Sequence, residues 1–494
     1  MTFDQIKPKA VIKNLNRVEL KNLASKDEIT TEFGSPSYIT NVRSRSAKFT
    51  EIVFDQPNPS QNKIIKEALE YISRKRVVMI ERTMCQSDEI NFLCRFYVTK
   101  NYARNAFMWH EMLFEPINKS EPDLVVVSIP EWPERKVLVL INDRITFILG
   151  SDYTGEVKKA FLRMAMYVVK QKGWLGLHAG SKIIKVRTKT QKLIKKGVLL
   201  FGLSGTGKTT LTCHNHYLEG NEGVIIKQDD VVFLKPDGSA IGTENNFYMK
   251  TEGINPKTDP VLYKAVIHHT AILENVFVEE NGEVDFSNRL LTSNGRAVVM
   301  RKKMDDTDDD INLPYVNIVI FITRRNDIVP PVIKLTQEQG AAFFMLGESV
   351  ETSAGDPSQV GRSKHVVGTN PLIIGPEAEE GNRFYEILKS HPDMEVYVLN
   401  TGRVGGDNGE KISVQESVEI IKQIARGSIK WDVDRNWKYY IPVEIPNINL
   451  ELYNPLNYYA ESEYNQRLQN LKNDRKEWLK KFPKLDPAIL RTFE

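Results

Sequence analysis

The sequence predicts an α/β protein of two main domains, and three observations support this. The chain has 494 residues, enough for two or three domains, because one domain commonly holds about 100 to 200 residues. Short apolar runs alternate with polar turns through residues 36–190, as they do in an α/β domain. A further apolar run leads into the glycine-rich stretch FGLSGTGKTT at residues 201–210, which predicts a second, nucleotide-binding domain.

The first domain is expected to follow a lightly structured lead, because residues 1–35 are polar and weakly patterned. The runs RVVMI, LCRFYV, LVVVSI and KVLVLI predict the strands of an α/β domain over residues 36–190. A helix is predicted over residues 155–173, because apolar residues recur there at helical spacing, namely Val157, Phe161, Met164 and Val168.

The second domain is expected over residues 191–455, where GVLLFG, GVIIKQDD and NIVIFITRR predict the strands of a nucleotide-binding core. The basic segment 181–197 predicts either a linker between the domains or a hairpin at their boundary, with its charges in solvent. Gly, Ser and Pro are frequent in residues 352–371, which predicts a mobile lid. Residues 456–494 predict a charged C-terminal helix that packs on the outside.

Composition argues against several kinds of partner. The 67 Lys and Arg residues nearly balance the 64 Asp and Glu residues, for a net charge of +3, so no overall field favours nucleic acid or an anionic membrane. The three cysteines are too few and too scattered for a disulfide framework or a zinc cluster, which favours a reducing compartment. No apolar stretch has the length of a membrane span, and the first residues lack the apolar run of a signal peptide. We therefore expect a cytoplasmic protein.

The stretch at 201–210 contains a phosphate-loop motif. Gly202, Gly207, Lys208 and Thr209 satisfy the pattern G-x4-G-K-[ST] directly after an apolar strand, which is the context that the motif requires. The glycines allow backbone N–H groups to turn toward phosphate oxygens, Lys208 supplies a cation, and the Thr209 hydroxyl suits the accompanying magnesium ion. The sequence therefore predicts a nucleoside triphosphate site with Mg²⁺.

Two adjacent carboxylates follow the next predicted strand, GVIIKQDD. Asp229 and Asp230 stand at its end, where carboxylates often bind a metal or position a water molecule. A solvated turn is the alternative, and the nearby phosphate loop favours the metal site.

An ordered set of short motifs runs along the chain: DYTGEVKK (152–159), GWLGLHAGS (173–181), GLSGTGKTTL (202–211), QDD (228–230), YMKT (248–251), LENVFV (273–278), VDF (284–286), TSNGRAV (292–298), VPPVIKLT (329–336) and LNTGRVGG (399–406). In content and order, this set resembles the motifs of the ATP-dependent phosphoenolpyruvate carboxykinase family over roughly residues 36–430. The resemblance implies a two-domain carboxykinase-like fold, with the active site in the cleft between an N-terminal α/β domain and a C-terminal phosphate-loop domain.

Carried over residue by residue, the resemblance implies that Lys159, His178 and Asp230 bind a manganese ion. By itself, Lys159 would be interpreted as an exposed cation and His178 as a core residue. A lysine binds a metal only in its neutral form. The implied catalytic set combines these three ligands with three further residues: Lys208, Asp229 and Arg296, the last lying between the nucleotide and the substrate phosphate.

The resemblance also implies binding residues for both substrates. For oxaloacetate they are Tyr153, Lys159, Arg296 and Arg45 of RSRSAKF, with Arg43 as the alternative to Arg45, because a guanidinium suits a dicarboxylate. For the nucleotide they are Gly202, Leu203, Ser204, Gly205, Thr206, Gly207, Lys208, Thr209, Thr210, Glu244, Lys250, Glu274, Lys411, Ile412 and Ser417. His214, His216, His268 and His269 match nothing in the family pattern and are expected on the surface or in helices.

The implied reaction converts oxaloacetate and ATP to phosphoenolpyruvate, ADP and CO2, reversibly, in gluconeogenesis or CO2 fixation. It uses Mn²⁺ in the active site and Mg²⁺ on the nucleotide, with closure of the lid over the reactants. A homo-oligomer is compatible with the sequence. No nucleic acid or membrane partner is expected.

This chain departs from the family pattern in four kinds of segment, and two other classes of function stay open. The departures are RSRSAKF in the substrate segment, QDD and NTGR (Arg403) in the core motifs, the sequence of the lid, and EKISVQES on the adenine side. One alternative is a related kinase with a different small-molecule or serine acceptor, which the predicted manganese set disfavours. The other is a nucleotide-binding protein without catalysis, which the intact Lys208, Thr209 and Arg296 disfavour.

Overall fold

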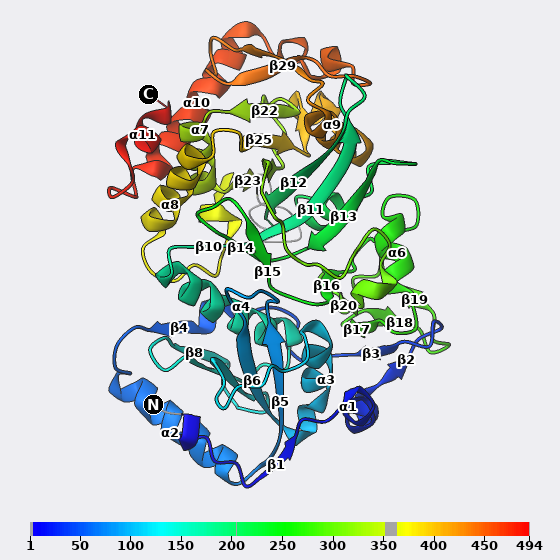
Figure 1. Cartoon of the computed structure of the whole chain (residues 1–494), viewed down its shortest axis with the longest axis vertical. Coiled ribbons are helices and arrows are strands. Elements are labelled where there is room, and N and C mark those ends of the chain that lie inside the picture. Colours follow the sequence, from blue (N-terminus) through cyan, green and yellow to red (C-terminus); the bar gives the residue numbers. More distant parts are fainter. Residues whose placement is uncertain (1–2, 204, 351–362, 494) are drawn as a thin grey trace. The chain divides into compact units, whose positions relative to one another are not determined.

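The structure is a computed structural model, and it describes residues 3–203, 205–350 and 363–493. The chain divides into two compact units. Unit 1 comprises Met1–Val168 and Thr243–Asp305, and unit 2 comprises Val169–Gly242 and Asp306–Glu494. Figure 1 labels most of the helices and strands of both. The architecture is α/β, as the sequence predicts.

The largest sheet of unit 1 has seven strands in the order β1-β5-β6-β7-β9-β8-β4. The central strands of this sheet are parallel, because β6 pairs in parallel with β7, and β7 pairs in parallel with β9. The four predicted runs are confirmed as β5 to β8. The strands are β1 (Ala10–Lys13), β4 (Thr50–Val53), β5 (Arg76–Met84), β6 (Phe92–Thr99), β7 (Leu124–Ile129), β8 (Lys136–Leu140) and β9 (Ile145–Leu149).

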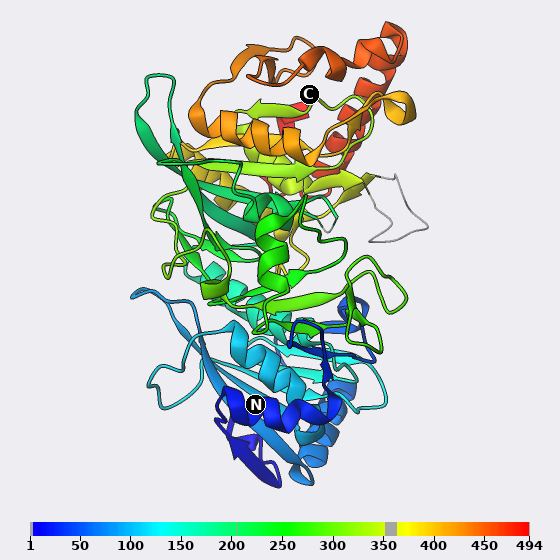
Figure 2. The same ribbon diagram turned by 90° about the vertical axis from the view of Figure 1, so that its right-hand side faces the viewer.

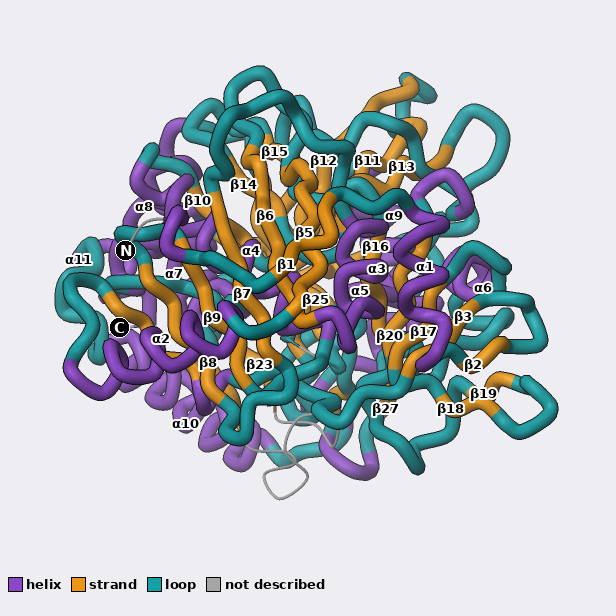
Figure 3. Tube along the Cα trace, turned by 90° about the horizontal axis from the view of Figure 1, so that it is seen from below, coloured by secondary structure: helices purple, strands orange, loops and turns teal. Residues whose placement is uncertain are grey.

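Helices cover both faces of this sheet. The apolar side of α2 (Pro59–Ser73) packs on β7, β8 and β9 in one buried core, and Figure 3 shows α2 beside β8 and β9. On the other face, Trp109 of α3 (Ala103–Met112) contacts Phe96 of β6 and stacks on Phe161 of α4 (Thr154–Gln171). The helix predicted over 155–173 is therefore confirmed as α4, with its apolar side in the core.

The first 35 residues are more ordered than the sequence suggests. β1 pairs in parallel with β5, from Ala10 opposite Arg76 to Lys13 opposite Met79. Helix α1 (Arg17–Ala24) begins with a capping box between Asn16 and Glu19, which satisfies backbone N–H groups at its start. The expectation of a lightly structured lead is wrong, because a four-residue edge strand gives too short a pattern to recognise.

A second sheet explains why residues 243–305 belong to unit 1. Its order is β16-β20-β17-β3-β2, and β17 pairs in parallel with β3 near the start of the chain. Residues 191–455 were expected to form a single domain, whereas the structure groups this inner segment with unit 1. Its elements are β2 (Ile29–Thr30), β3 (Pro36–Tyr38), β16 (Phe247–Lys250), α6 (Pro260–Val266), β17 (Ile272–Glu274), β18 (Phe277–Val278), β19 (Val284–Asp285) and β20 (Arg296–Val299).

Unit 2 is built on an eight-stranded sheet in the order β13-β11-β12-β21-β25-β22-β29-β28. β12, β21 and β25 are parallel neighbours, so the loops that follow them emerge at one edge. The strands are β11 (Ala179–Arg187), β12 (Leu193–Gly202), β13 (Gly223–Gln228), β21 (Ile318–Thr323), β22 (Val332–Leu335), β25 (Glu395–Asn400), β28 (Lys430–Val433) and β29 (Tyr440–Glu444).

Smaller sheets and, among the described residues, six α-helices complete unit 2. Figure 2 shows the C-terminal helices, in orange and red, beside its large sheet. The strands are β10 (Leu175–Leu177), β14 (Val232–Leu234), β15 (Ala240–Gly242), β23 (Glu348–Val350), β24 (Ser363–His365), β26 (Arg403–Val404) and β27 (Glu410–Lys411). The helices are α5 (Lys208–Cys213), α7 (Gln337–Leu346), α8 (Glu377–Ser390), α9 (Val414–Arg426), α10 (Glu461–Leu479) and α11 (Pro487–Leu490).

The segment 181–197 is a hairpin inside unit 2, not a linker. β11 and β12 pair antiparallel from Ala179 opposite Phe201 to Arg187 opposite Leu193, and the boundary between the units falls at Val168, within α4. The predicted C-terminal helix is confirmed as α10, although Leu468, Leu471 and other residues of it enter the core. Most of the predicted lid, residues 352–362, lies outside the described residues. No helix in the described part of the chain is long and apolar enough to cross a membrane.

Candidate functional site

The loop between β12 and α5 has the backbone geometry of a phosphate loop. β12 ends at Gly202 and α5 begins at Lys208. Gly207, which precedes the helix, has φ of 97°, a left-handed value that glycine adopts without strain. A Cβ atom on Gly202 would lie 2.5 Å from the hydroxyl oxygen of Thr206. Gly207 is therefore favoured by its left-handed backbone conformation, and Gly202 by the close approach of the Thr206 side chain.

Neighbouring strands hold this loop in place. Arg324, directly after β21, donates from Nη1 to the carbonyl oxygen of Gly205 at 2.6 Å. Thr401, directly after β25, donates its hydroxyl to the carbonyl oxygen of Thr206 at 2.8 Å. Sequence reasoning missed Arg324, although two arginines directly after a parallel strand could have indicated it. The other loop residues occupy the expected positions: Leu203 follows β12, Thr209 and Thr210 lie half-buried in α5, and Ser204 lies outside the described residues.

The structure brings His178, Lys208 and Asp230 together in unit 2. β10 and β14 pair antiparallel with Leu177 opposite Val232, so the residues flanking that pair lie at one end of the ladder. Nε2 of His178 lies 3.1 Å from Oδ1 of Asp230, and Nζ of Lys208 lies 3.7 Å from the same oxygen. A metal-type carboxylate therefore stands beside the phosphate-loop lysine, while its neighbour Asp229 is buried.

The ring of His178 is oriented as in a metal ligand. Its Nδ1 lies 2.8 Å from the carbonyl oxygen of Thr369, which can only accept, so Nδ1 carries the hydrogen. In the neutral ring Nε2 then presents a lone pair toward the carboxylate of Asp230, and two electron-rich groups at this distance suit a shared cation. These donors fit a divalent metal ion. In residues 3–203, 205–350 and 363–493 no group of three or more His, Cys, Asp and Glu is placed to hold a metal.

Helix α4 of unit 1 carries two adjacent lysines with different surroundings. Lys158 is buried, with Nζ 2.8 Å from a carboxylate oxygen of buried Glu244. Lys159 is half-buried. Nζ of Lys158 also lies 5.6 Å from the ring centre of Tyr248, and the guanidinium carbon of Arg296 lies 5.7 Å from it. Glu244, expected at the nucleotide, thus neutralises Lys158 within unit 1.

Asn294 links three expected substrate residues in unit 1. Its amide nitrogen donates to the hydroxyl of Tyr153 at 3.1 Å and to the carbonyl oxygen of Arg43 at 2.9 Å. Its amide oxygen accepts from Nη2 of Arg296 at 2.8 Å. Sequence reasoning missed Asn294 as a functional residue, although it lies inside the motif TSNGRAV.

The contacts distinguish Arg43 from Arg45. Arg43 donates to two carbonyl oxygens, that of Leu291 at 2.6 Å and that of Thr40 at 3.2 Å. These bonds give Arg43 a role in fixing the loop. Arg45 is half-buried, and its charge helps to lower the pKa of the neighbouring Arg163, although burial of that guanidinium contributes most. The contacts therefore favour Arg45 as the arginine that meets a substrate.

Glu274 and Lys250 were expected at the nucleotide, and both have protein partners in unit 1. Glu274 is fully buried and accepts from the N–H of Thr154 at 3.0 Å and from the hydroxyl of Tyr248 at 2.5 Å. Burial raises the pKa of this carboxyl group. Lys250 is paired with Glu252. These contacts give Glu274 a positioning role beneath α4.

The expected adenine-side residues lie next to the phosphate loop in unit 2. The N–H of Ile412 donates to the carbonyl oxygen of Gly402 at 2.9 Å, one residue from Thr401. Ile412 and Ser417 are buried, and the hydroxyl of Ser417 donates to the carbonyl oxygen of Ser413. Lys411 is exposed. Of the three, only Lys411 presents its side chain to solvent.

His214 and His216, expected on the surface or in helices, are buried after the end of α5 beside Lys182, a lysine that was expected in solvent. Nζ of Lys182 lies 2.6 Å from Nε2 of His216 and donates to the carbonyl oxygens of Leu211 and His214 at 2.5 and 3.3 Å. Burial lowers the pKa of Lys182 to about 7. Both expectations were wrong because Lys182 donates hydrogen bonds to carbonyl groups at and just after the end of α5. The basic composition of the hairpin gives no sign of these acceptors.

Comparison with known proteins gives consistent matches. The family model described as phosphoenolpyruvate carboxykinase matches residues 9–451, a range that includes every site residue above. A protein of Aeropyrum pernix named phosphoenolpyruvate carboxykinase (ATP) is 36% identical over 428 residues, which cover 85% of this chain and 84% of the relative. Proteins of the same name from the RF122 and Newman strains of Staphylococcus aureus are 26% identical over 432 residues, covering 81% of this chain and 76% of each relative.

Proposed function

The chain belongs to the phosphoenolpyruvate carboxykinase family, and we propose that it converts oxaloacetate and ATP to phosphoenolpyruvate, ADP and CO2, reversibly. The observation that carries this proposal is the placement of His178 and Asp230 beside Lys208. A phosphate-binding lysine next to a metal-type donor pair suits phosphoryl transfer, which depends on positioning and charge neutralisation.

We assign the metal ions as follows. His178, Asp230 and Lys159 would hold Mn²⁺, and the hydroxyl of Thr209 would hold the Mg²⁺ that accompanies ATP. The orientation of the His178 ring supports the first assignment. When bound, these ions supply Lewis acidity and positive charge for an oxygen that becomes negative during the reaction.

The residues of the chain then bind and orient the reactants. Arg45 and the hydroxyl of Tyr153 hold the carboxylates of oxaloacetate, and Asn294 fixes Tyr153 and Arg296 relative to each other. Cleavage of the bond to the departing carboxylate releases CO2 and leaves its electron pair in an enolate. The enolate oxygen attacks the γ-phosphorus of ATP, the bond to the β-phosphate oxygen breaks, and ADP leaves. Arg296 offsets the charge on the group in transit.

The nucleotide is assigned to the phosphate loop and the segment beside it. Residues 202–210 receive the phosphates, with Lys208 on the outer ones, and Lys411 and Ile412 receive the base and ribose. Asp229 supports the loop that carries Asp230. Lys250 would contact the phosphates once its ammonium group leaves Glu252 for the nucleotide. Glu244 positions Lys158, and Glu274 positions Tyr248.

An initial-rate assay tests this function. Phosphoenolpyruvate, bicarbonate and Mn²⁺ are supplied with either ADP or GDP, and the oxaloacetate formed is reduced by malate dehydrogenase with NADH. Loss of NADH with ADP, well above that with GDP, is expected. The absence of turnover with both nucleotides, while ATP still binds, would contradict the proposal and favour a kinase for another acceptor.

A further inference from the structure

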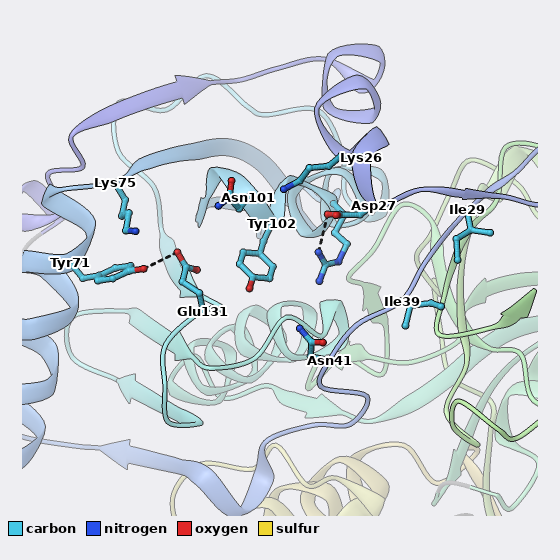
Figure 4. Close-up of a pocket in the computed structure, with 11 residues that line it drawn as sticks. Lys26, Asp27, Ile29, Ile39, Asn41, Tyr71, Lys75, Asn101, Tyr102 and Glu131 are labelled. Atoms are coloured by element: carbon cyan, nitrogen blue, oxygen red, sulfur yellow. Dashed lines mark hydrogen bonds and ion pairs between the residues drawn. The ribbon is translucent and has the colours of Figure 1, made fainter.

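Unit 1 has a pocket of about 480 Å³ that contains none of the residues assigned to oxaloacetate, nucleotide or metal. Figure 4 shows it between the end of α2, the turns Ser25–Asp27 and Lys100–Tyr102, and the segment that follows β3. Pockets that bind small molecules commonly have volumes of roughly 300 to 1,000 Å³ and a few converging polar groups. This pocket has both properties.

The charged groups around the pocket favour an anion. Three cations line it, Lys26, Lys75 and Arg104, against two carboxylates, Asp27 and Glu131. Asp27 accepts from Arg104 at 3.2 Å. Glu131 accepts two hydroxyl hydrogen bonds, from Tyr71 at 3.1 Å and from Thr99 at 2.7 Å. The lining therefore carries an excess of one positive charge, and each carboxylate already has donors from the protein.

Aromatic and aliphatic side chains form the rest of the wall. Figure 4 shows the rings of Tyr71 and Tyr102 beside the cations, and Ile29 and Ile39 at the other end. Nζ of Lys75 lies 4.7 Å from the ring centre of Tyr71. Ile29 and Ile39 are 36% and 40% exposed, so apolar surface there is available to a ligand. Rings and cations side by side suit an anion with a flat or apolar body.

A buried guanidinium connects the pocket to the substrate segment of the same unit. Arg104 donates from Nη2 to the carboxylate of Asp152 at 2.6 Å. The same carboxylate accepts from the backbone N–H groups of Asn41 and Val42, each at 2.9 Å. Asp152 directly precedes Tyr153, and Val42 directly precedes Arg43. A ligand that draws Arg104 away from Asp27 therefore also acts on the anchor of the segment that carries Arg45.

We propose that this pocket binds a small organic anion, a carboxylate or a phosphate monoester with a flat or apolar body, and that its occupancy changes oxaloacetate binding through Arg104 and Asp152. The site itself is independent of the proposed function. Its effect on oxaloacetate rests on the proposed roles of Arg45 and Tyr153.

Isothermal titration of the full chain tests the binding. The probes are phenyl phosphate, benzoate and inorganic phosphate, each titrated with the catalytic nucleotide site filled by a non-hydrolysable ATP analogue and Mg²⁺. We expect phenyl phosphate or benzoate to bind with a Kd of about 1 mM or below, and inorganic phosphate to bind more weakly because it lacks a body for the Tyr and Ile wall. The two ring-bearing probes distinguish a phosphate ligand from a carboxylate ligand.

A matched pair of double variants locates the site. Lys26→Ala with Lys75→Ala should weaken binding by roughly tenfold or more, because each removed ammonium loses a charge-assisted contact. Lys63→Ala with Lys66→Ala removes the same charge from exposed positions of α2 outside the pocket and should leave the affinity unchanged. Equal binding by both double variants, or no binding of any ring-bearing probe, would overturn the proposed site.

Oxaloacetate affinity tests the linkage. The ring-bearing probe that binds should shift the Kd for oxaloacetate, measured by titration, in the parent protein and in the Lys63/Lys66 control but not in the Lys26/Lys75 variant. An unchanged Kd with the pocket filled would overturn the linkage. The titrations of the probes and of oxaloacetate record binding and do not require turnover. A failure of the proposed function would therefore appear in the carboxykinase assay, whereas a failure of the proposed pocket would appear in these titrations.

Discussion

Nε2 of His178 lies 3.1 Å from Oδ1 of Asp230, while Nδ1 of the same ring is fixed by the carbonyl oxygen of Thr369 at 2.8 Å. With its hydrogen on Nδ1, a neutral His178 ring directs the lone pair of Nε2 at the carboxylate of Asp230. The arrangement explains why a histidine at the end of a short strand can serve as a metal ligand and not merely as a core residue.

Removing either partner of this pair should impair metal activation. His178→Gln and Asp230→Asn are each expected to lower kcat on the order of 10²-fold or more, because the metal ion that offsets the negative charge on the reacting oxygen would be held less firmly. The loss should accompany weaker Mn²⁺ binding, measured from the electron paramagnetic resonance of free Mn²⁺. His269→Gln, at an exposed position, is the matched control. Unchanged Mn²⁺ affinity in both site variants would remove the pair from the metal site.

The same measurement of Mn²⁺ binding tests Lys159, the third proposed metal ligand. Lys159→Gln should weaken Mn²⁺ binding and activation while ATP affinity stays as in the parent protein. If metal dependence is unaltered, Lys159 is not a ligand.

Lys208 is expected to control affinity for the triphosphate. Lys208→Ala should weaken ATP binding by about 10- to 100-fold, the range for a lost hydrogen bond to a charged group. Binding is measured by titration without oxaloacetate, so that turnover does not interfere. Lys192→Ala, at the exposed tip of the β11–β12 hairpin, should bind ATP normally. Equal affinities in the two variants would contradict the role of the phosphate loop.

Substitution of Arg45 should affect substrate binding, whereas substitution of Arg43 should affect stability. Arg45→Ala is expected to raise the KM for oxaloacetate by roughly 10- to 100-fold, because a bidentate contact to a carboxylate is lost. Arg43→Ala should instead reduce stability by about 1 kcal/mol, since it leaves the carbonyl groups of Leu291 and Thr40 without their donor. Steady-state kinetics and thermal unfolding of both variants separate these effects. The opposite ranking of KM values would assign the substrate contact to Arg43.

Stability should rise with pH because of Lys182. Burial lowers the pKa of this lysine from 10.5 to about 7, so between these pH values the unfolded chain binds more protons than the folded one. The free energy of unfolding therefore increases as pH rises above about 7, and the gain is complete near the unfolded pKa. Thermal unfolding between pH 7 and 9.5 should show a rising Tm in the parent protein and a flatter profile in Lys182→Met. Parallel profiles would mean that Lys182 is not the group responsible.

Sequence patterns identified the elements whose signal is local. The phosphate loop has closely spaced glycines followed by Gly207, Lys208 and Thr209, and the apolar periodicity of α4 repeats over about five turns. Both signals can be read without tertiary information. Lys159 and His178 were assigned to the metal only through resemblance to a family, because a single lysine or histidine has no distinctive local pattern. Asp230 was also indicated by its place in a pair of carboxylates at the end of a predicted strand.

Other features depend on contacts between distant parts of the chain. The pairing of β17 with β3 joins Leu273 to Ser37, and no local periodicity reports such a partner. Asn294, Arg324 and the Arg104–Asp152 pair acquire their roles from neighbours in space. The burial of Lys182 was missed for the same reason, since its acceptors belong to the end of α5 and the following turn.

Phosphorus nuclear magnetic resonance of the product mixture tests the central claim most directly. The purified chain is mixed with oxaloacetate, ATP, Mn²⁺ and Mg²⁺, the reaction is quenched, and the metals are chelated before spectra are recorded. The account predicts stoichiometric appearance of phosphoenolpyruvate and ADP as ATP disappears, and their absence with Lys208→Ala. Formation of ADP with inorganic phosphate alone, or with a phosphate ester other than phosphoenolpyruvate, would contradict it.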